Sequence, residues 1–253
     1  MEELSPKGLN LVVAVAGDEV HVWEIALDEA VTRAVELGLL LSADEHERAA
    51  RFYFRADGDR WILCRGALRS IVARYIGIPP KDLVFQSNAY GKPQLAPALQ
   101  SSCLHFNLTH TQKLALLAVA PSEIGIDTEY INPDLSWQTL APEVLSDCEL
   151  SQLLDSPLAV QQRLFFEFWT RKEAYIKGRG LGLSLPLKAF HVSLTETGQI
   201  SVAAPWDDGR PWRLFGLQTY PTHVAALAYA GKLSILQRFI WKEEDLQPLK
   251  EPG

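Results

Sequence analysis

The apolar residues in the first half of the chain follow the pattern of short strands around turns. Residues 11–27, LVVAVAGDEVHVWEIAL, predict two strands that meet at a Gly-Asp turn. Residues 82–95 predict a strand, a polar turn and a second extended piece. Residues 104–120 predict a hairpin that turns near residues 111–113.

A longer stretch with helical periodicity, residues 41–80, lies between these strands. Ser42 and Glu45 fit a capping box at its start. Gly77, followed closely by two prolines, predicts its end. We therefore expect one long helical region in the first half.

The second half repeats this order of elements. Ser146 and Glu149 fit a second capping box, and a long helical pattern follows over residues 158–178. Four strands are then predicted, at residues 188–194, 199–204, 212–220 and 223–231.

An internal match supports two similar halves. LALLAVA at 114–120 and VAALAYA at 224–230 agree at four of seven positions, with an offset of 110 residues. We expect an α+β fold in which each half is a small, mostly antiparallel sheet packed with a long helix. The expected boundaries are residues 1–120, residues 121–242 and a flexible tail at 243–253.

Composition narrows the range of functions. The 253 residues are 47% hydrophobic, which is typical of a globular protein, and the net charge of -7 argues against a general nucleic-acid binder or a basic membrane-surface protein. The chain has no run of ~18 apolar residues that would predict a membrane span. The three cysteines are far apart and lack metal-ligand spacing, so we expect buried free thiols in a reducing cytoplasm.

Two acidic residues lie in a stretch that is otherwise mostly apolar, EIGIDTEYI at 123–131. Asp127 and Glu129 are two residues apart, so on a strand both carboxylates point to the same face. Like charges on one face repel each other. Either the pair binds a divalent cation such as Mg²⁺, which prefers hard oxygen ligands, or it lies at a solvated strand end.

A second candidate site lies in FWTRKEAYIKGRGLGL at 168–183. Trp169, Glu173 and Lys177 are spaced i, i+4, i+8 and share one stripe of a helix. The plain alternative is a Glu–Lys surface pair that contributes only a few tenths of a kcal/mol. The aromatic sequence before the pair and the glycine-rich exit favour a functional role.

A third candidate site combines YGKPQL at 90–95 with HFNLTHT at 105–111. Gly91, Lys92 and Pro93 form a turn by composition, and Lys92 is either functional or merely solvent-facing. His110 near a strand end is either functional or a structural histidine whose hydrogen bonds are satisfied.

Taken in order, the motifs YGKPQL, FNLTHT, GIDTEYI and FWTRKEAYIKGRGLGLSLPL resemble the Sfp-type 4′-phosphopantetheinyl transferases. The last motif is similar to the variant W-x-x-K-E-A-x-x-K, met here as Trp169, Lys172, Glu173, Ala174 and Lys177. The resemblance extends from about residue 42 to about residue 187.

The resemblance implies a fold, a reaction and partners. The fold would be two halves related by a pseudo-twofold, with coenzyme A in the cleft between them. The enzyme would transfer the 4′-phosphopantetheine arm of coenzyme A to a serine of an apo acyl or peptidyl carrier protein and release adenosine 3′,5′-bisphosphate. Mg²⁺, or Mn²⁺ in its place, would be required. We expect a cytoplasmic monomer that binds neither nucleic acid nor membranes.

The resemblance also implies site residues. The metal ligands would be Asp127, Glu129 and Glu173. Glu173 would also be the general base, and Lys177 would steady the phosphate charge. The residues expected to bind coenzyme A are Arg48, Gly91, Lys92, Pro93, Asn107, Thr109, His110, Lys172 and Lys177.

Two other functions stay open at this point. A Mg²⁺-dependent nucleotide hydrolase could use the same carboxylates, but it would need a positioned water and no docking face for a carrier. A non-catalytic subunit that binds coenzyme A or a carrier would be expected to lack Asp127, Glu173 or Lys177, and all three are present.

Overall fold

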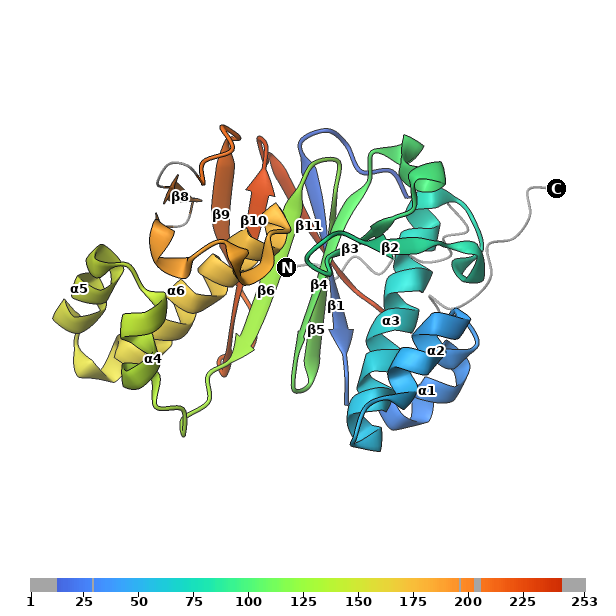
Figure 1. Cartoon of the computed structure of the whole chain (residues 1–253), viewed down its shortest axis with the longest axis horizontal. Coiled ribbons are helices and arrows are strands. Elements are labelled where there is room, and N and C mark those ends of the chain that lie inside the picture. Colours follow the sequence, from blue (N-terminus) through green and yellow to red (C-terminus); the bar gives the residue numbers. More distant parts are fainter. Residues whose placement is uncertain (1–12, 29, 196, 203–205, 243–253) are drawn as a thin grey trace.

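The computed structural model describes residues 13–242 apart from residues 29, 196 and 203–205. Helices and strands are mixed in two bodies that lie side by side, each with a sheet and a long helix (Figure 1). The expected α+β architecture with two subdomains is confirmed.

The first body holds one four-stranded sheet and three α-helices. Its elements in chain order are β1 (Glu19–Ala26), α1 (Ala30–Gly38), α2 (Ala43–Ala50), α3 (Arg55–Ile76), β2 (Phe85–Ser87), β3 (Pro93–Leu95), β4 (His105–Thr111) and β5 (Leu114–Ala120). The sheet order is β11-β1-β5-β4, while β2 and β3 pair separately as a small hairpin. The helix α3 packs on this sheet through a buried core that includes Leu68, Ile71 and Leu117.

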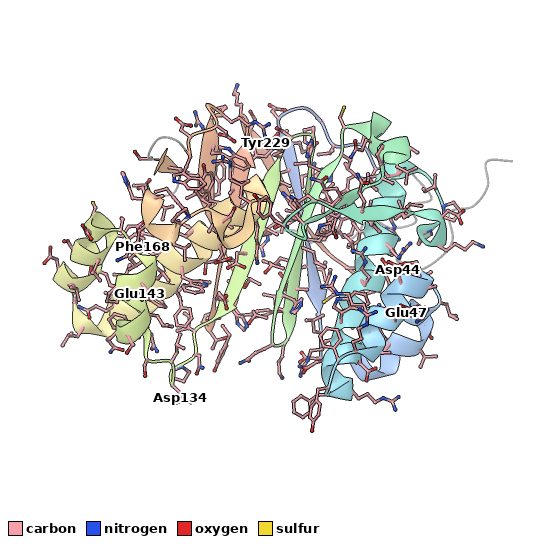
Figure 2. The ribbon with its side chains drawn as sticks, in the orientation of Figure 1. Asp44, Glu47, Asp134, Glu143, Phe168 and Tyr229 are labelled. Carbon is pink, nitrogen blue, oxygen red and sulfur yellow. The ribbon has the colours of Figure 1, made fainter. Side chains whose placement is uncertain are left out.

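The second body holds a five-stranded sheet and three more helices. Its elements are β6 (Ile124–Tyr130), α4 (Trp137–Val144), α5 (Asp147–Asp155), α6 (Leu158–Arg179), β7 (Phe190–Val192), β8 (Thr197–Val202), β9 (Trp212–Leu217) and β10 (His223–Ala230). The last strand of the described chain, β11 (Ile235–Ile240), returns to the sheet of the first body. The sheet order is β6-β10-β9-β8-β7. Phe168 lies on the side of α6 that packs in the core of this body (Figure 2).

Apolar side chains also join the two sheets. Val22, Leu116 and Ala118 of the first sheet share a buried cluster with Ile126 and Leu227 of the second. Tyr229 on β10 belongs to the same cluster and lies between the two bodies in Figure 2. Because burying apolar surface stabilises the contact, the two bodies are held against each other by a core of their own.

Several local predictions are confirmed. Both capping boxes are present, at Ser42 with Glu45 and at Ser146 with Glu149. Gly77 ends α3 with a positive φ of 76°, the left-handed conformation that glycine adopts without strain. The hairpin at 104–120 forms as β4 and β5, in an antiparallel register.

Other predictions are wrong in detail. The helical stretch 41–80 is broken between α2 and α3, where Phe54 is extended at φ -96° and ψ 128°. The helix α1 was not predicted, since its first turn carries no acidic residue to mark a start. Residues 13–16 form no strand, and residues 11 and 12 lie outside the described residues, as does the tail after 242.

The strand β11 changes the expected division of the chain. Residues 121–242 were expected to form the second half, but β11 pairs in parallel with β1 of the first sheet. Its edge position and half-exposed residues gave it no clear alternating pattern in the sequence. The first sheet is therefore built from both ends of the described chain.

The cysteine prediction is partly wrong. All three cysteines are free, as expected, but only Cys64 is buried, whereas Cys103 and Cys148 are exposed. Burial raises the pKa of the Cys64 thiol to about 12, so this side chain behaves as a small apolar group.

Candidate active site

The strands β4 and β6 lie next to each other at the edges of their two sheets, here called the β4–β6 junction (residues 105–111 and 124–130). The two strands belong to different sheets, and a side chain bridges them. The backbone N–H of Ile126 donates a hydrogen bond to Oδ1 of Asn107 over 2.8 Å. Asn107 thereby fixes β6 next to the strand that carries Thr109.

The helix α6 lies directly on β6 because two glycines face each other. A Cβ atom on Gly125 would lie 2.0 Å from the carbonyl oxygen of Ala174 and 2.2 Å from the backbone nitrogen of Gly178. Only a residue without a side chain permits this approach. The contact brings the last turns of α6, with Glu173 and Lys177, close to Asp127.

Three polar side chains form a bonded cluster at this point. Nζ of Lys177 lies 2.5 Å from Oδ1 of Asp127 and donates a second bond to Oγ1 of Thr109 over 3.1 Å. The Thr109 hydroxyl in turn donates to Asp127 over 3.1 Å. The sequence prediction placed these three residues in one site, and the structure brings them together from β4, β6 and α6.

Two further carboxyl groups next to this cluster are destabilised as anions. Burial, then the charge of Asp127, raises the pKa of Glu129 to about 7, while the charge of Lys177 opposes the shift. Burial and the charge of Asp127 also raise the pKa of Glu173. Burial and the neighbouring negative charge therefore disfavour the ionised form of both carboxyl groups.

The oxygen atoms of this cluster are donors of the kind that a hard divalent cation prefers. Oδ2 of Asp127 is buried and has no hydrogen-bond partner, and a cation would satisfy this oxygen. No group of three or more His, Cys, Asp or Glu side chains within the described part of the chain is arranged to hold a metal ion. The expected trio of Asp127, Glu129 and Glu173 is therefore not preformed. Mg²⁺ commonly takes only one or two carboxylates and fills its other positions with water and substrate phosphates.

Lys172 does not belong to this cluster, which corrects the expectation that its side chain binds coenzyme A. Its side chain is fully buried, and Nζ lies 2.8 Å from a carboxylate oxygen of Glu149. Nζ also donates to the carbonyl oxygens of Leu187 and Phe190, over 2.8 and 2.7 Å. Lys172 therefore joins α6 to α5 and to residues 187–190, where β7 begins, and its ammonium is not free to contact a ligand.

Replacing Lys172 with Met is expected to lower the free energy of unfolding by ~3–5 kcal/mol, because the Glu149 carboxylate would be left buried without its cation. Urea unfolding measures the loss. Lys188→Met changes an exposed lysine nearby and should alter stability by less than ~0.5 kcal/mol. Unchanged stability with a weakened affinity for coenzyme A would instead restore the ligand role.

One pocket collects most of the residues expected to bind coenzyme A in the first body. This cavity of about 280 Å³, here called the Arg48 pocket, is lined by Arg48, Gly91, Pro93 and His110 among others. The Arg48 guanidinium lies 5.7 Å from the centre of the Trp61 ring. Burial, then the charges of Lys177 and Arg60, lowers the pKa of His110.

A second pocket, of about 230 Å³, reaches the candidate catalytic residues. This Glu173 pocket is lined by Lys92, Asn107, Glu173 and Lys177, and it shares Gly91 and Leu108 with the Arg48 pocket. Ligand sites for small molecules typically span ~300–1,000 Å³. Each pocket alone is smaller than that range, and the shared wall residues make the two pockets neighbours.

The sequence analysis missed several pocket residues. Tyr90, Leu108 and Ile176 line the Glu173 pocket, and Trp61 and Phe85 line the Arg48 pocket. These side chains are apolar or aromatic and carry no chemical signal apart from their place beside the motifs. Gly180 and Gly182 also line the Glu173 pocket, and their positive φ angles of 65° and 54° explain the glycine-rich exit after α6.

The raised pKa of Glu129 predicts a dependence of stability on pH. The carboxyl titrates at 4.5 when unfolded and at about 7 when folded, so the folded state holds more protons between these values. The free energy of unfolding should therefore fall as pH rises from 4.5 to 7, by ~3 kcal/mol at most from this group.

The measurement compares wild type with Glu129→Gln by urea unfolding between pH 4.5 and 8, without metal or coenzyme A. Subtracting the Glu129→Gln curve from the wild-type curve cancels the contribution of the histidines. Some histidines have lowered pKa values, which make the free energy of unfolding rise with pH. The control is Glu143→Gln on α4, an exposed carboxylate away from the β4–β6 junction (Figure 2). A difference curve that is flat, or that rises with pH, would contradict the assignment.

Comparisons with known proteins identify the family of the chain. The 4′-phosphopantetheinyl transferase superfamily model matches residues 123–229, and the model of an N-terminal 4′-phosphopantetheinyl transferase domain matches residues 29–122. Together the two matches cover most of the chain. The chain belongs to the 4′-phosphopantetheinyl transferase superfamily.

Individual relatives carry the same description. The chain is 39% identical to the 4′-phosphopantetheinyl transferase HetI of Nostoc sp., over 89% of this chain and 93% of the relative. It is 35% identical to the 4′-phosphopantetheinyl transferase Sfp of Bacillus subtilis, over 65% of this chain and 71% of that protein. It is 33% identical to the 4′-phosphopantetheinyl transferase psf-1 of Bacillus pumilus, over 67% and 71%.

Among the residues that the structure describes, no helix is both long and apolar enough to cross a bilayer.

Proposed function

We propose that this chain carries out the reaction of its family at the β4–β6 junction, with Mg²⁺ held by the carboxylates of Asp127, Glu129 and Glu173. The chain is a phosphopantetheinyl transferase that uses coenzyme A as substrate and acts on carrier proteins. The proposal concerns the metal, the residues and their roles.

One observation carries the assignment of the site. The Arg48 pocket and the Glu173 pocket share Gly91 and Leu108 in their walls, so residues expected at the nucleotide end of coenzyme A and residues expected at the reacting phosphate line neighbouring pockets. Arg48 and His110 suit the 3′-phosphate end. Gly91 and Pro93 of the turn suit the adenine end, where glycine permits close backbone approach.

The reaction joins a serine oxygen of the carrier to the β-phosphorus of coenzyme A. The bond from that phosphorus to the bridging oxygen breaks, and adenosine 3′,5′-bisphosphate leaves with the electron pair. Glu173 accepts the serine proton, directly or through a water. Burial and the charge of Asp127 raise the pKa of Glu173 toward neutral pH. A general base is most effective when its pKa lies near the pH at which the enzyme works.

The Lys177 ammonium stabilises the negative charge that develops on the phosphate oxygens. Nζ of Lys177 is fixed by Asp127 and Thr109, and the side chain is 31% exposed, so it can also face a ligand in the Glu173 pocket. Bound Mg²⁺ would supply further positive charge between the carboxylates and the diphosphate. Thr109 is buried and lines neither pocket, so it is proposed to orient Lys177 and Asp127.

We also propose that the protein acts in the cytoplasm as a monomer. Three free cysteines, two of them exposed, suit a reducing compartment. Size-exclusion chromatography with light scattering measures the oligomeric state, and a mass of twice 28.2 kDa would contradict the monomer.

The first experiment is intact-mass spectrometry of an apo acyl carrier protein incubated with coenzyme A, Mg²⁺ and the enzyme. We expect a gain of one phosphopantetheine mass, lost when EDTA is added and absent from a carrier whose acceptor serine is replaced by alanine. Transfer that continues in the presence of EDTA would refute the metal requirement. Coenzyme A binding without any mass gain on several carriers would indicate a non-catalytic subunit, and cleavage of coenzyme A without transfer would indicate a hydrolase.

A further inference from the structure

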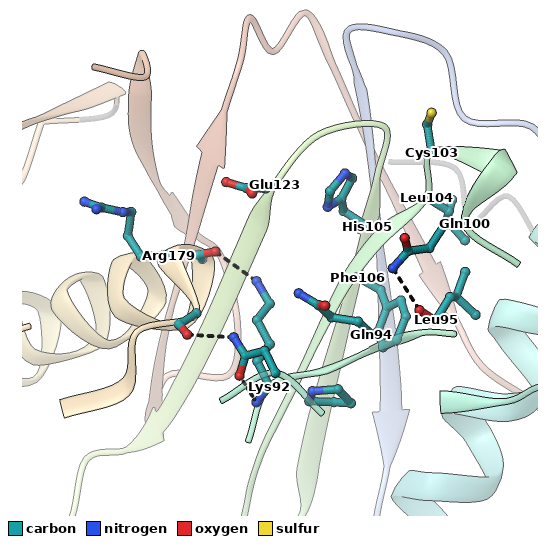
Figure 3. Close-up of a pocket in the computed structure, with 14 residues that line it drawn as sticks. Lys92, Gln94, Leu95, Gln100, Cys103, Leu104, His105, Phe106, Glu123 and Arg179 are labelled. Carbon is teal, nitrogen blue, oxygen red and sulfur yellow. Dashed lines mark hydrogen bonds between the residues drawn. The ribbon is translucent and has the colours of Figure 1, made fainter. Parts of the chain in front are cut away.

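The end of α6 that carries the candidate catalytic residues is held by side chains of the other body. The last carbonyl groups of a helix lack partners within the helix and need them elsewhere. In α6 these include the carbonyls of Gly178 and, just past the end, Gly180. Nζ of Lys92 donates to the Gly178 oxygen over 2.9 Å, and Nδ2 of Asn88 donates to the Gly180 oxygen over 2.7 Å (Figure 3).

Lys92 also contacts the strand under the helix. Its Nζ donates to the carbonyl oxygen of Ile124, the first residue of β6, over 3.0 Å. One ammonium group therefore joins the turn at 88–92 to both β6 and α6. Burial lowers the pKa of the Lys92 ammonium to about 8.

The turn that presents these side chains is itself rigid. Oδ1 of Asn88 accepts hydrogen bonds from the backbone N–H groups of Tyr90 and Lys92, over 2.9 and 3.0 Å. The backbone N–H of Asn88 donates to the Lys92 carbonyl over 2.9 Å. Asn88 thus shapes the turn with one side-chain atom and reaches the opposite body with the other.

This turn also forms the wall of the proposed coenzyme A site. Gly91 lines both adjoining pockets, and Lys92 lines the Glu173 pocket. Lys177 immediately precedes Gly178, and Glu173 lies just over one turn before it. A shift in the hydrogen bonds from Lys92 and Asn88 to the end of α6 would therefore move Glu173 and Lys177 relative to the substrate.

We propose that Lys92, together with Asn88, is a positioning residue that caps the carboxyl end of α6 from the opposite body and sets where Glu173 and Lys177 stand against coenzyme A. This inference rests on the proposed function. It replaces the expectation that the Lys92 ammonium binds coenzyme A, because that ammonium is bonded to two backbone carbonyls. The backbone of the turn keeps its place in the pocket wall.

The test separates positioning from ligand binding by steady-state kinetics. Lys92→Met keeps the length of the side chain and removes its donors. We expect kcat to fall about 10- to 100-fold, as small misplacements of catalytic groups do, with KM for coenzyme A changed less than about threefold. The dissociation constant for coenzyme A, measured by calorimetry without carrier, should change as little as KM.

Two further variants distinguish a loss of positioning from a loss of folding. Asn88→Asp keeps the acceptor that shapes the turn and loses the donor to Gly180, so kcat should again fall more than KM rises. Lys92→Arg keeps hydrogen-bond donors and should recover part of the lost kcat. The matched control, Lys81→Met, alters an exposed lysine outside both pockets and should leave both parameters unchanged.

The outcomes are distinct from those that test the function itself. Absence of turnover in the wild-type protein would contradict the proposed function. With active wild type, a KM or dissociation constant raised tenfold or more at unchanged kcat in Lys92→Met would show that Lys92 binds coenzyme A and overturn the positioning role. Unchanged kcat and KM in both Lys92→Met and Asn88→Asp would overturn it as well.

Discussion

Replacing Glu173 with Gln is expected to lower kcat by about 10²–10⁴-fold, because the amide cannot accept the serine proton and is a weaker metal ligand. Carrier modification followed by intact mass measures the rate. The variant should also be slightly more stable than wild type without ligands, since burial and Asp127 disfavour the Glu173 carboxylate. Loss of activity together with gain of stability is the signature of a residue kept for function.

The matched control for this variant is Glu167→Gln on the same helix. Glu167 forms a surface pair with Arg163 over 3.1 Å and lines neither adjoining pocket. Its loss should leave kcat within about twofold, because surface ion pairs contribute little. If Glu173→Gln kept near wild-type turnover, the assignment of the whole site would be wrong.

Replacing Gly125 with Ala is expected to remove nearly all activity through backbone geometry alone. The added methyl group would meet the Ala174 carbonyl at 2.0 Å and the Gly178 nitrogen at 2.2 Å, so α6 must move away from β6. Such overpacking costs ~1–3 kcal/mol or more, and the shift separates Lys177 from Asp127. Urea unfolding and the transfer assay measure the two effects.

Gly17→Ala is the control for this substitution. A Cβ atom on Gly17 would meet no atom within 4 Å, so stability and activity should be close to those of wild type. Full activity of Gly125→Ala would show that the direct packing of α6 on β6 is not what brings Glu173 and Lys177 to the site.

The sequence predicted those features that depend on local pattern or on a complete motif. The β4–β5 hairpin and α6 follow from periodicity, and both capping boxes follow from residues three positions apart. Asp127 lies in one cluster with Lys177, as the combined motifs implied. Each of these features can be read within a short window of sequence or from motif order.

Features that depend on distant partners were not predicted. Lys172 looks like a surface residue of a charged helix, and only the fold reveals that Glu149 and two carbonyls enclose it. The strand β11 has no pattern that reveals its pairing with β1. The hydrogen bond from Lys92 to the Gly178 carbonyl of α6 likewise depends on how the two bodies meet, which no local pattern encodes.

The pairing of β11 with β1 has a consequence for how the protein is synthesised. The ribosome makes β1 first, yet the strand that covers its outer edge is the last one of the described chain. Until residue 240 has emerged, β1 presents unpaired N–H and C=O groups, which are a template for aggregation. The first body therefore completes its sheet only after the second has been made, and this edge of β1 stays unpaired until then.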